Sequence, residues 1–465
     1  MEKQKHNDST GASNSRPTPR KGWRGAGLVV NVARMVLAVV FIFSGFVKAV
    51  DPRGTQYKIA DYLETMQLAD IVPDAVTLAT SIALAALEFT IGILLLFAIR
   101  RRIASRLALL LLAVMTPLTL WLALANPISD CGCFGDAVVI TNWQTFGKNA
   151  LLLALAAIVA AKPTKMFRFV SESNQWIVVN YTILFILAIS ARSLYDLPQL
   201  DFRPYHVGAN IPEGMAIPDG AELPQFETTF ILEKGGQRKE FSLDEYPDST
   251  WTFVDSRTVE TRRGYVPPIH DFSITTDQGD DITEQVLGSD SYTFLLVAPH
   301  LEKADDSQHD QINELYEYAQ EHDYPFYCLT ASNATGVSRW RDLTGAEYPF
   351  CRTDEITLKT IIRSSPGLVL IKAGTVVRKW SHNNLPVIDN TQASLPLDQL
   401  PAGQMPQDSM PHKVVRLMLW FVLPLLLLVI ADRTWAWTQW LRRRKPQEKN
   451  EQPTPKKQKQ REKKL

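Results

Sequence analysis

The stretch LVVNVARMVLAVVFIFSGFVKAV, residues 28–50, is an apolar run long enough to cross a lipid bilayer, which takes about 20 helical residues. A hydrophobic content of 46% and a net charge of zero would also suit a soluble protein, so the distribution of apolar residues decides the class. Five further apolar runs lie at 75–98, 103–125, 147–161, 176–194 and 414–431. The sequence therefore predicts six membrane spans.

Lysine and arginine side chains mark the cytoplasmic ends of membrane spans. In this chain they cluster at Arg20, Lys21, Arg24, Arg100, Arg101, Arg102, Arg106, Lys162, Lys165, Arg168 and from Arg442 to Lys445. This pattern places both termini in the cytoplasm. We expect the inner membrane of a bacterium, with the connections 51–74 and 126–146 and the large segment 195–413 in the periplasm.

The two ends of the chain are polar and of low complexity. Residues 1–22 and 445–465 are predicted to be disordered. No small-residue cleavage pattern follows the first apolar run, which favours an uncleaved span over a signal peptide. The basic tail adjoins a span, so topology and contact with the lipid bilayer explain its charge, and no nucleic-acid partner is predicted.

Cys131 and Cys133 flank one glycine in SDCGCFGD, residues 129–136, directly after the third span. One intervening residue keeps their Cα atoms within about 7 Å, so a disulfide can form but is strained. A strained, exposed disulfide exchanges readily, which favours electron relay in an oxidising compartment. Two alternatives stay open: a structural disulfide or Gly-rich turn, and a pair of soft ligands for copper or zinc, although the loop contains no histidine.

Three short stretches around this motif carry a resemblance: ISDCGCFGD, ITNW and KNALLLALA, at 128–136, 140–143 and 148–156. They resemble the four-span domain of the methylamine-utilisation MauE family. FSGFVKAVDP and LEFTIGILLLFAIRRRIA, at 43–52 and 87–104, are similar to the broader DoxX-like group. Where the family usually has arginine, this chain has Lys148.

The resemblance implies a membrane partner for a thioredoxin-like protein in periplasmic disulfide chemistry. The sequence predicts no metal and no cofactor of its own, and a quinone stays open without support from the residues.

Two charged side chains fall inside predicted spans, Arg34 in the first and Glu88 in the second. Counted from the cytoplasmic ends, they differ in depth by about 5 Å, so we predict an intramembrane ion pair that fixes helix packing. A proton or quinone-side relay is the functional alternative. Lys48, at the outer boundary, is read as a snorkelling side chain.

The segment 195–413 divides into two parts. TTFILEK and RKEFSL on either side of Gly235-Gly236, followed by TWTFVDS, predict a small β-rich module within 198–265. After it, strands at 292–299, 325–332, 368–372 and 375–381 alternate with helices at 311–323 and 338–345.

This order looks like a thioredoxin-like fold over 266–396, and PPIHDFSITTDQGDDIT, residues 267–283, resembles its peroxiredoxin and TlpA-like branch. The resemblance implies that Pro366 is a cis proline. An unrelated α/β sandwich is the alternative. Where a working thioredoxin carries Cys-x-x-Cys, this chain has APHLEKAD, residues 298–305, which excludes a dithiol site there.

Cys328 and Cys351 are the remaining cysteines. Both are predicted in neighbouring strands, either as two buried small hydrophobic residues, as a disulfide, or as a thiol that exchanges with the membrane loop.

The sequence thus predicts an α-helical polytopic membrane bundle with an extracytoplasmic α/β thioredoxin-like domain and a small β-rich module. The predicted segments are 1–27, 28–161, 162–197, 198–265, 266–396, 397–413, 414–431 and 432–465. The leading hypothesis is a membrane component of a thiol and disulfide electron relay, and a thiol-disulfide oxidoreductase if the chain is an enzyme. Its partner would be a thioredoxin-like or other periplasmic thiol protein. The rival is a docking or assembly protein without redox turnover.

Overall fold

The structure is a computed structural model. It describes residues 24–128, 131–223, 225–235, 237–242, 247, 250–262, 264–389 and 391–444. The tails predicted to be disordered lie outside these residues, as do Ser129 and Asp130 of the cysteine motif and Gly236 of the predicted hairpin.

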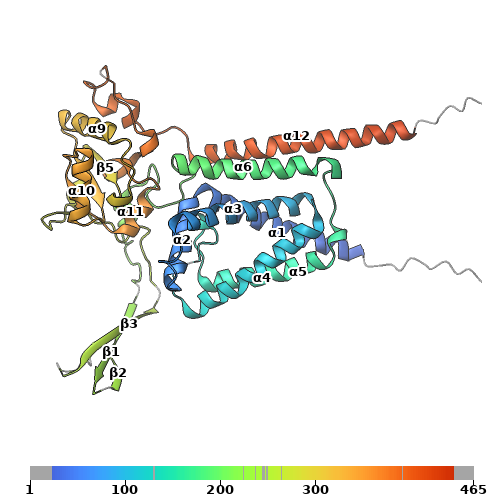
Figure 1. The fold of residues 1–465 in the computed structure, drawn as a ribbon, viewed down its shortest axis with the longest axis horizontal. Coiled ribbons are helices and arrows are strands. Elements are labelled where there is room, and N and C mark those ends of the chain that lie inside the picture. The colour runs from blue at the N-terminus through green and yellow to red at the C-terminus, as the bar shows by residue number, and fades with distance from the viewer. Residues whose placement is uncertain are drawn as a thin grey trace, which may run out of the picture.

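Six helices within the described residues are long and apolar enough to cross a membrane, which confirms the predicted number of spans. They are α1 (Arg24–Val50), α3 (Asp74–Phe97), α4 (Arg101–Ala125), α5 (Asn142–Ala161), α6 (Gln175–Tyr195) and α12 (Met410–Arg444). Figure 1 shows α1, α3, α4 and α5 as one bundle, with α6 and α12 side by side along it. The chain is therefore a multi-pass membrane protein.

The helix α2 (Pro52–Thr65) lies between the first two spans, where the sequence predicts only a connection. The Asp51 carboxylate accepts a hydrogen bond from the Gly54 amide at 2.9 Å, and Pro52 occupies the first helical position. An acidic cap followed by proline is a helix-start signal. The sequence analysis did not predict α2 because no helical periodicity of apolar residues follows that signal.

The spans α1 and α3 approach closely because glycine lies at their contact. A side chain at Gly45 would collide with the backbone of Phe89, and one at Gly92 would collide with Ile42. Small residues allow such close packing between membrane helices. The register of this contact sets which side chains of α1 and α3 lie at the same depth.

A ring cluster joins α12 to the rest of the helices. Phe421 lies 4.6 Å from Phe185 of α6 and 5.1 Å from Phe89 of α3, measured between ring centroids. Eleven residues further along α12, Asp432 accepts a hydrogen bond from Asn174 at 2.7 Å. The last span is thus packed on the bundle rather than separate from it.

A six-stranded mixed sheet follows α6 in the chain. Its strands are β4 (Thr275–Thr276), β5 (Tyr292–Val297), β6 (Phe326–Thr330), β7 (Phe350–Arg352), β8 (Gly367–Lys372) and β9 (Thr375–Ser381). The spatial order is β4-β7-β6-β5-β8-β9, with β5, β6 and β7 parallel and the other pairs antiparallel. Every residue of β5 is buried, as expected for a central strand covered on both faces.

Helices cover both faces of this sheet. They are α7 (Ile211–Met215), α8 (Thr283–Leu287), α9 (His309–Glu321), α10 (Ala334–Thr344) and α11 (Glu355–Ile361). One core contains side chains of α9 and α10, and the other contains side chains of α7, α8 and α11. The longer strands and helices match their predicted positions, and β7 is the strand expected around Cys351 beside that of Cys328, whereas β4, α7, α8 and α11 were not predicted. We call strands β4 to β9 with α8 to α11 the sheet region.

A second, three-stranded antiparallel sheet consists of β1 (Gln225–Lys234), β2 (Gln237–Ser242) and β3 (Thr252–Arg262), in the order β2-β1-β3. Its three strands correspond to the three predicted ones. It projects away from the sheet region in Figure 1.

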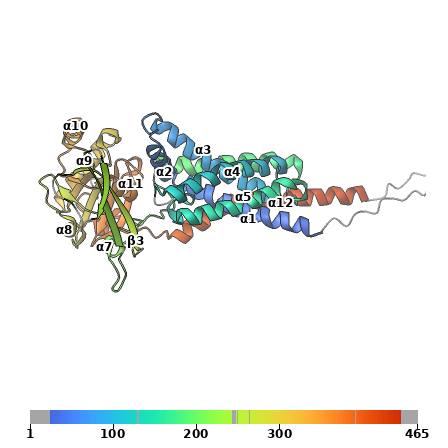
Figure 2. The same cartoon turned by 90° about the horizontal axis from the view of Figure 1, so that it is seen from below.

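The two sheets and the helices that cover the larger one lie at one end of the bundle (Figure 2). The C-terminal ends of α1, α4 and α6 and the N-terminal ends of α3, α5 and α12 meet there, beside α2. The sheet region and the cysteine motif are therefore on the same side of the spans.

Candidate functional site

The cysteine loop, residues 131–136, is held to α1 and α2 through its backbone. The Cys133 carbonyl accepts hydrogen bonds from Lys48 Nζ at 2.8 Å and from Ser44 Oγ at 2.9 Å. The Cys131 carbonyl accepts one from the Tyr62 hydroxyl at 2.8 Å. The backbone on each side of the central glycine is therefore fixed by the helices that end and begin beside it.

Cys131 and Cys133 are both free thiols in this structure. Cys131 is only 9% exposed, and Cys133 is half-buried. Gly132 between them has φ +63°, a conformation that favours glycine. The Cys131 sulfur also lies 3.7 Å from Thr145 Oγ1 of α5.

The surroundings of Cys131 and Cys133 shift the pKa values of the two thiols in opposite directions. A hydrogen bond from the Cys133 thiol lowers the pKa of Cys131 to about 6, against the effect of burial, and Thr145 and Lys148 act in the same direction. The same hydrogen bond, together with burial, raises the pKa of Cys133. One thiol is thus suited to be a nucleophilic thiolate, and its neighbour keeps the proton.

A buried ion pair between Lys48 and Glu88 contacts the cysteine loop through Lys48. Lys48 Nζ lies 2.7 Å from Glu88 Oε2, and Ser44 Oγ donates to the same oxygen at 2.7 Å. Lys48 is 6% exposed, so it is not the snorkelling side chain that the sequence predicted. Its ammonium group joins the membrane carboxylate of α3 to the backbone of the cysteine loop.

The predicted ion pair between Arg34 and Glu88 is wrong. Arg34 donates instead to the Phe167 carbonyl at 2.7 Å and lies over the ring of Phe169, whose amide bonds to the Phe97 carbonyl at the end of α3. Glu88 is nine residues from Phe97, which corresponds to about 13 Å along the helix. The two charges therefore lie at different depths.

A cavity of about 310 Å³ extends from the cysteine loop into the bundle. We call it the bundle cavity. Its walls come from α1, α2, α3, α4, α5 and the cysteine loop. They include Val40, Phe41, Ile59, Leu84, Leu111, Leu112, Met115, Leu118, Leu122, Leu152 and, among polar groups, Lys48, Glu88, Cys131, Cys133, Lys148 and Asn149. Both thiols thus border a mainly apolar space.

The sheet region is attached to the cysteine loop by a buried arginine. Arg363 Nη2 lies 2.8 Å from Asp51 Oδ2 at the start of α2 and 3.1 Å from Asp136 Oδ2 in the cysteine loop. A second contact joins Lys303 to Asp74 at the start of α3, at 3.2 Å. The charges of the sheet region and the membrane helices are complementary at this junction.

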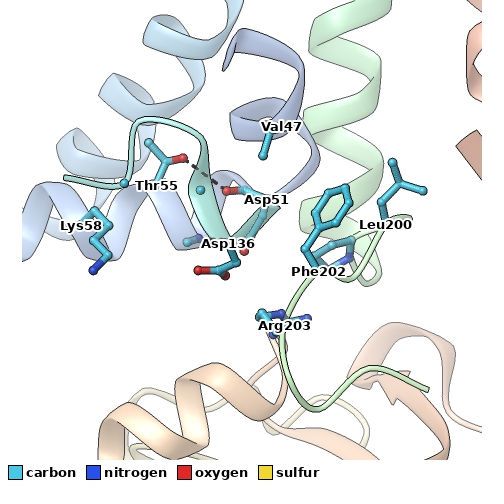
Figure 3. A pocket seen from close by; sticks show the side chains of 12 residues that line it. Val47, Asp51, Thr55, Lys58, Asp136, Leu200, Phe202 and Arg203 are labelled. Carbon is cyan, nitrogen blue, oxygen red and sulfur yellow. Dashed lines mark hydrogen bonds between the residues drawn. The ribbon is translucent and has the colours of Figure 1, made fainter. Parts of the chain in front are cut away.

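The segment that leaves α6 completes the junction. Asp51, Asp136 and Arg203 line a small cavity, and Figure 3 shows their side chains around it. Its volume is about 20 Å³, which is room for about one water molecule. Arg203 pairs with Asp201 at 2.7 Å, and Lys379 of β9 pairs with the same carboxylate at 3.0 Å. Burial alone would raise the pKa of Asp201, but Lys379 and Arg203 outweigh it and hold that pKa well below its usual range.

Cys328 and Cys351 are free and lie on opposite faces of the sheet. Cys328 of β6 belongs to the core that contains α9 and α10, and Cys351 of β7 belongs to the other core. In the register of β6 with β7, Cys328 lies opposite Phe350 and Leu329 lies opposite Cys351. A disulfide between them is therefore excluded, since neighbouring side chains along a strand alternate between faces.

The segment 298–305 follows β5, as predicted, and contains the short helix η4 (Leu301–Lys303). The Asp305 amide donates to the Ser365 carbonyl at 3.0 Å. The Ser365–Pro366 peptide bond is cis, the geometry that the resemblance implies for Pro366. Lys303 and Arg363 both contact the bundle. The end of the sheet at which β5 ends and β8 begins therefore faces the bundle.

A known protein family matches the part of the chain that forms most of the bundle. The family described as methylamine utilisation protein MauE matches residues 26–162, which cover the first four spans and the cysteine loop. A family described only as a domain of unknown function, DUF8463, matches residues 226–263, the three-stranded sheet. Among curated proteins, none matches the chain.

Among solved structures, a solution structure from Bacteroides thetaiotaomicron, described provisionally as a protein disulfide isomerase, is 17% identical. The match covers 25% of this chain and 77% of the Bacteroides chain, with a TM-score of 0.21. The chain is thus a multi-pass membrane protein whose first four spans are similar to the MauE family.

The sequence identified Cys131 and Cys133 but not the groups that hold them. Lys48, Ser44 and Tyr62 lie far from the motif in the chain, and only the packing of α1 and α2 brings them to it. The spacing of Ser44 and Lys48, one helical turn apart at the outer end of the first span, was an available signal for a shared partner.

Proposed function

We propose that this chain is a membrane component of a thiol-disulfide electron relay, in which Cys131 and Cys133 exchange electrons with a thiol protein outside the cytoplasm. The observation that carries the proposal is the geometry of the pair. Two free thiols lie one residue apart in a loop whose carbonyls are fixed by Lys48, Ser44 and Tyr62, and both thiols border a cavity.

The proposed exchange has two steps. The Cys131 thiolate attacks a disulfide of the partner, a bond forms to one partner sulfur, and the other partner sulfur leaves and takes a proton. Cys133 then loses its proton and attacks the Cys131 sulfur, which forms the Cys131–Cys133 disulfide and releases the second partner thiol. The partner gains two electrons and the pair loses two. The reverse sequence oxidises a partner dithiol.

We further propose that residues 266–396 form a thioredoxin-like domain that lacks its dithiol. Three parallel strands followed by an antiparallel pair, helices on both faces and cis Pro366 directly before β8 support this assignment. The domain would hold or orient a partner rather than carry electrons, because 298–305 contains no cysteine.

The orientation is part of the same proposal. The lysine and arginine pattern supports cytoplasmic termini in a bacterial inner membrane and a periplasmic 195–413. Protease added to spheroplasts should digest 195–413 and leave both tails intact. Digestion of the tail after Lys445 from the outside would reverse the orientation and remove the periplasmic relay.

The decisive experiment traps the first step. Cys133→Ser should accumulate a mixed disulfide on Cys131 in oxidising membranes, because the attack that resolves it is lost. Cys131→Ser is the matched control, since it removes the proposed nucleophile and keeps the other thiol. Absence of any mixed disulfide on Cys131, with no change of the wild-type pair between oxidised and reduced membranes, would reject the relay.

A second candidate function is docking without redox turnover. The buried contact of Arg363 with the cysteine loop favours it, because it makes the loop a structural anchor for the sheet region. In that case Cys131→Ser/Cys133→Ser would keep full function in cells, whereas disruption of the Arg363 contact would abolish it.

A further inference from the structure

The bundle cavity is large enough to hold a small molecule. Its volume of about 310 Å³ is about twice that of engineered cavities that bind benzene, and it lies at the lower end of ordinary ligand pockets. Its wall on α4 is mainly apolar, with Leu111, Leu112, Met115, Leu118 and Leu122, and Val40 of α1 and Leu84 of α3 extend that apolar surface. A ring with apolar substituents suits such walls.

The polar groups of the cavity are gathered near the thiols. Lys148 of α5 lies 4.1 Å from the ring centroid of Phe134, which belongs to the cysteine loop, and its charge acts on both thiols. Asn149, the next residue, donates to Thr119 of α4 at 3.3 Å. The cavity thus offers hydrogen-bond donors beside two sulfur atoms, whereas its wall on α4, with Leu111, Leu112, Met115, Leu118 and Leu122, is mainly apolar.

The other side of the cysteine loop is covered by protein. Gly132 and Gly135 border the small cavity closed by Leu200, Phe202 and Arg203, and Arg363 covers Asp136. A small molecule that reaches the thiols from the bundle cavity comes from the membrane side. Met115 and Leu118 of the cavity wall are only half-buried, so the wall of α4 reaches the lipid-facing surface.

We propose that the bundle cavity binds the ring of a membrane-soluble quinone, which accepts electrons from Cys131 and Cys133. The inference rests on the proposed relay and names its electron acceptor. One S–S bond forms and the pair loses two electrons; the Cys133 S–H bond supplies one proton, the other comes from solvent because Cys131 is a thiolate, and together they convert both carbonyls of the quinone to the hydroxyls of a quinol. Electrons then flow from a partner dithiol through the cysteine pair to the membrane.

The test uses the full chain in lipid nanodiscs, reduced and freed of reductant under anaerobic conditions. Decyl-benzoquinone is added, and formation of the Cys131–Cys133 disulfide is followed by thiol labelling while quinol is followed by absorbance. Leu118→Trp and Leu112→Trp narrow the cavity from α4. Leu110→Trp, on the same helix but exposed away from the cavity, is the matched control.

The quinone should oxidise the wild type and Leu110→Trp at the same rate, with one quinol per disulfide, and the two cavity variants about tenfold more slowly. Binding of the quinone to Cys131→Ser/Cys133→Ser, measured at equilibrium without electron transfer, should weaken in Leu118→Trp and not in Leu110→Trp. This second readout keeps a folding defect of one variant from deciding the result.

Four outcomes would overturn the inference. If the quinone oxidises Leu118→Trp and the wild type at equal rates, it reacts with the thiols at the protein surface and not in the bundle cavity. If the quinone shows no saturable binding, the cavity does not bind it. If oxidised glutathione or a disulfide protein oxidises the pair but the quinone does not, the quinone inference fails and the relay survives. A pair that no oxidant converts rejects both proposals.

Discussion

Arg363 Nη2 lies 3.1 Å from Asp136 Oδ2, so the sheet region holds the same short loop that carries Cys131 and Cys133. The guanidinium group is 7% exposed and also contacts Asp51. The contact is specific because Arg363 without its two carboxylates would be left as a buried, unpaired charge. The junction couples the position of the extramembrane part to the geometry of the thiol loop.

Replacement of this arginine should loosen the junction. Arg363→Ala leaves the largely buried Asp51 without its cation, and breaking such a pair costs up to about 3–5 kcal/mol, whereas Asp136 is 42% exposed and adds little. We expect faster proteolysis of the segments 196–204 and 404–409 and faster maleimide labelling of Cys133. Arg238→Ala, which removes an exposed pair with Glu233 in the three-stranded sheet, is the control and should change neither rate. Equal rates in both variants would show that Arg363 does not hold the junction.

The reactivity of Cys131 should depend on pH in a defined way. Because its pKa is lowered to about 6, its thiolate predominates at pH 7, and the rate of alkylation should rise with a midpoint near pH 6. Cys133→Ala removes the first cause of the shift, the hydrogen bond from Cys133, so the midpoint should move upward. The measurement is iodoacetamide labelling of reduced protein across pH 5 to 9, read by mass spectrometry of the cysteine peptide. A midpoint that stays in place in Cys133→Ala would assign the shift to another group.

Much of the fold was predictable because long apolar runs and buried strands have strong signals. The run that contains β5, YTFLLV, has no charged residue and is largely apolar, as is typical of a strand covered on both faces. The two-residue strand β4 and the polar, one- to two-turn helices α8 and α11 have no such signal, and tertiary contacts determine them.

The error over Arg34 has a different origin. Depth was counted from the predicted ends of two spans, but depth in a bundle depends on how the helices pack. Contact of Gly45 with Phe89 places Glu88 level with Ser44 and Lys48, and no property of the sequence near Arg34 reports that register. The cysteine motif itself was local in sequence and was therefore found.

The pairing of Lys48 with Glu88 predicts a strong asymmetry between single and double substitutions. Lys48→Met leaves a buried carboxylate unpaired, at about 3–5 kcal/mol, whereas Lys48→Met/Glu88→Gln removes both charges and should recover most of that loss. The midpoint of thermal denaturation in nanodiscs measures both. Arg34→Gln is the matched control, and it should combine additively with Glu88→Gln because the two side chains do not touch. Coupling of Glu88 to Arg34 that exceeds its coupling to Lys48 would restore the pair predicted from the sequence.

Cys328 and Cys351 should remain unreactive in the folded protein. Burial raises the pKa of Cys328 above its usual range and that of Cys351 to about 11, so neither forms a thiolate near neutral pH. We expect maleimide to label Cys131 and Cys133 in reduced membranes while Cys328 and Cys351 stay unlabelled until urea unfolds the sheet region. Cys131→Ser/Cys133→Ser is the control, since its native labelling should fall to background. Because the two side chains lie on opposite faces of the sheet, oxidised protein should yield no peptide that links Cys328 to Cys351. A linked peptide from folded, unreduced protein would contradict the register of β6 with β7.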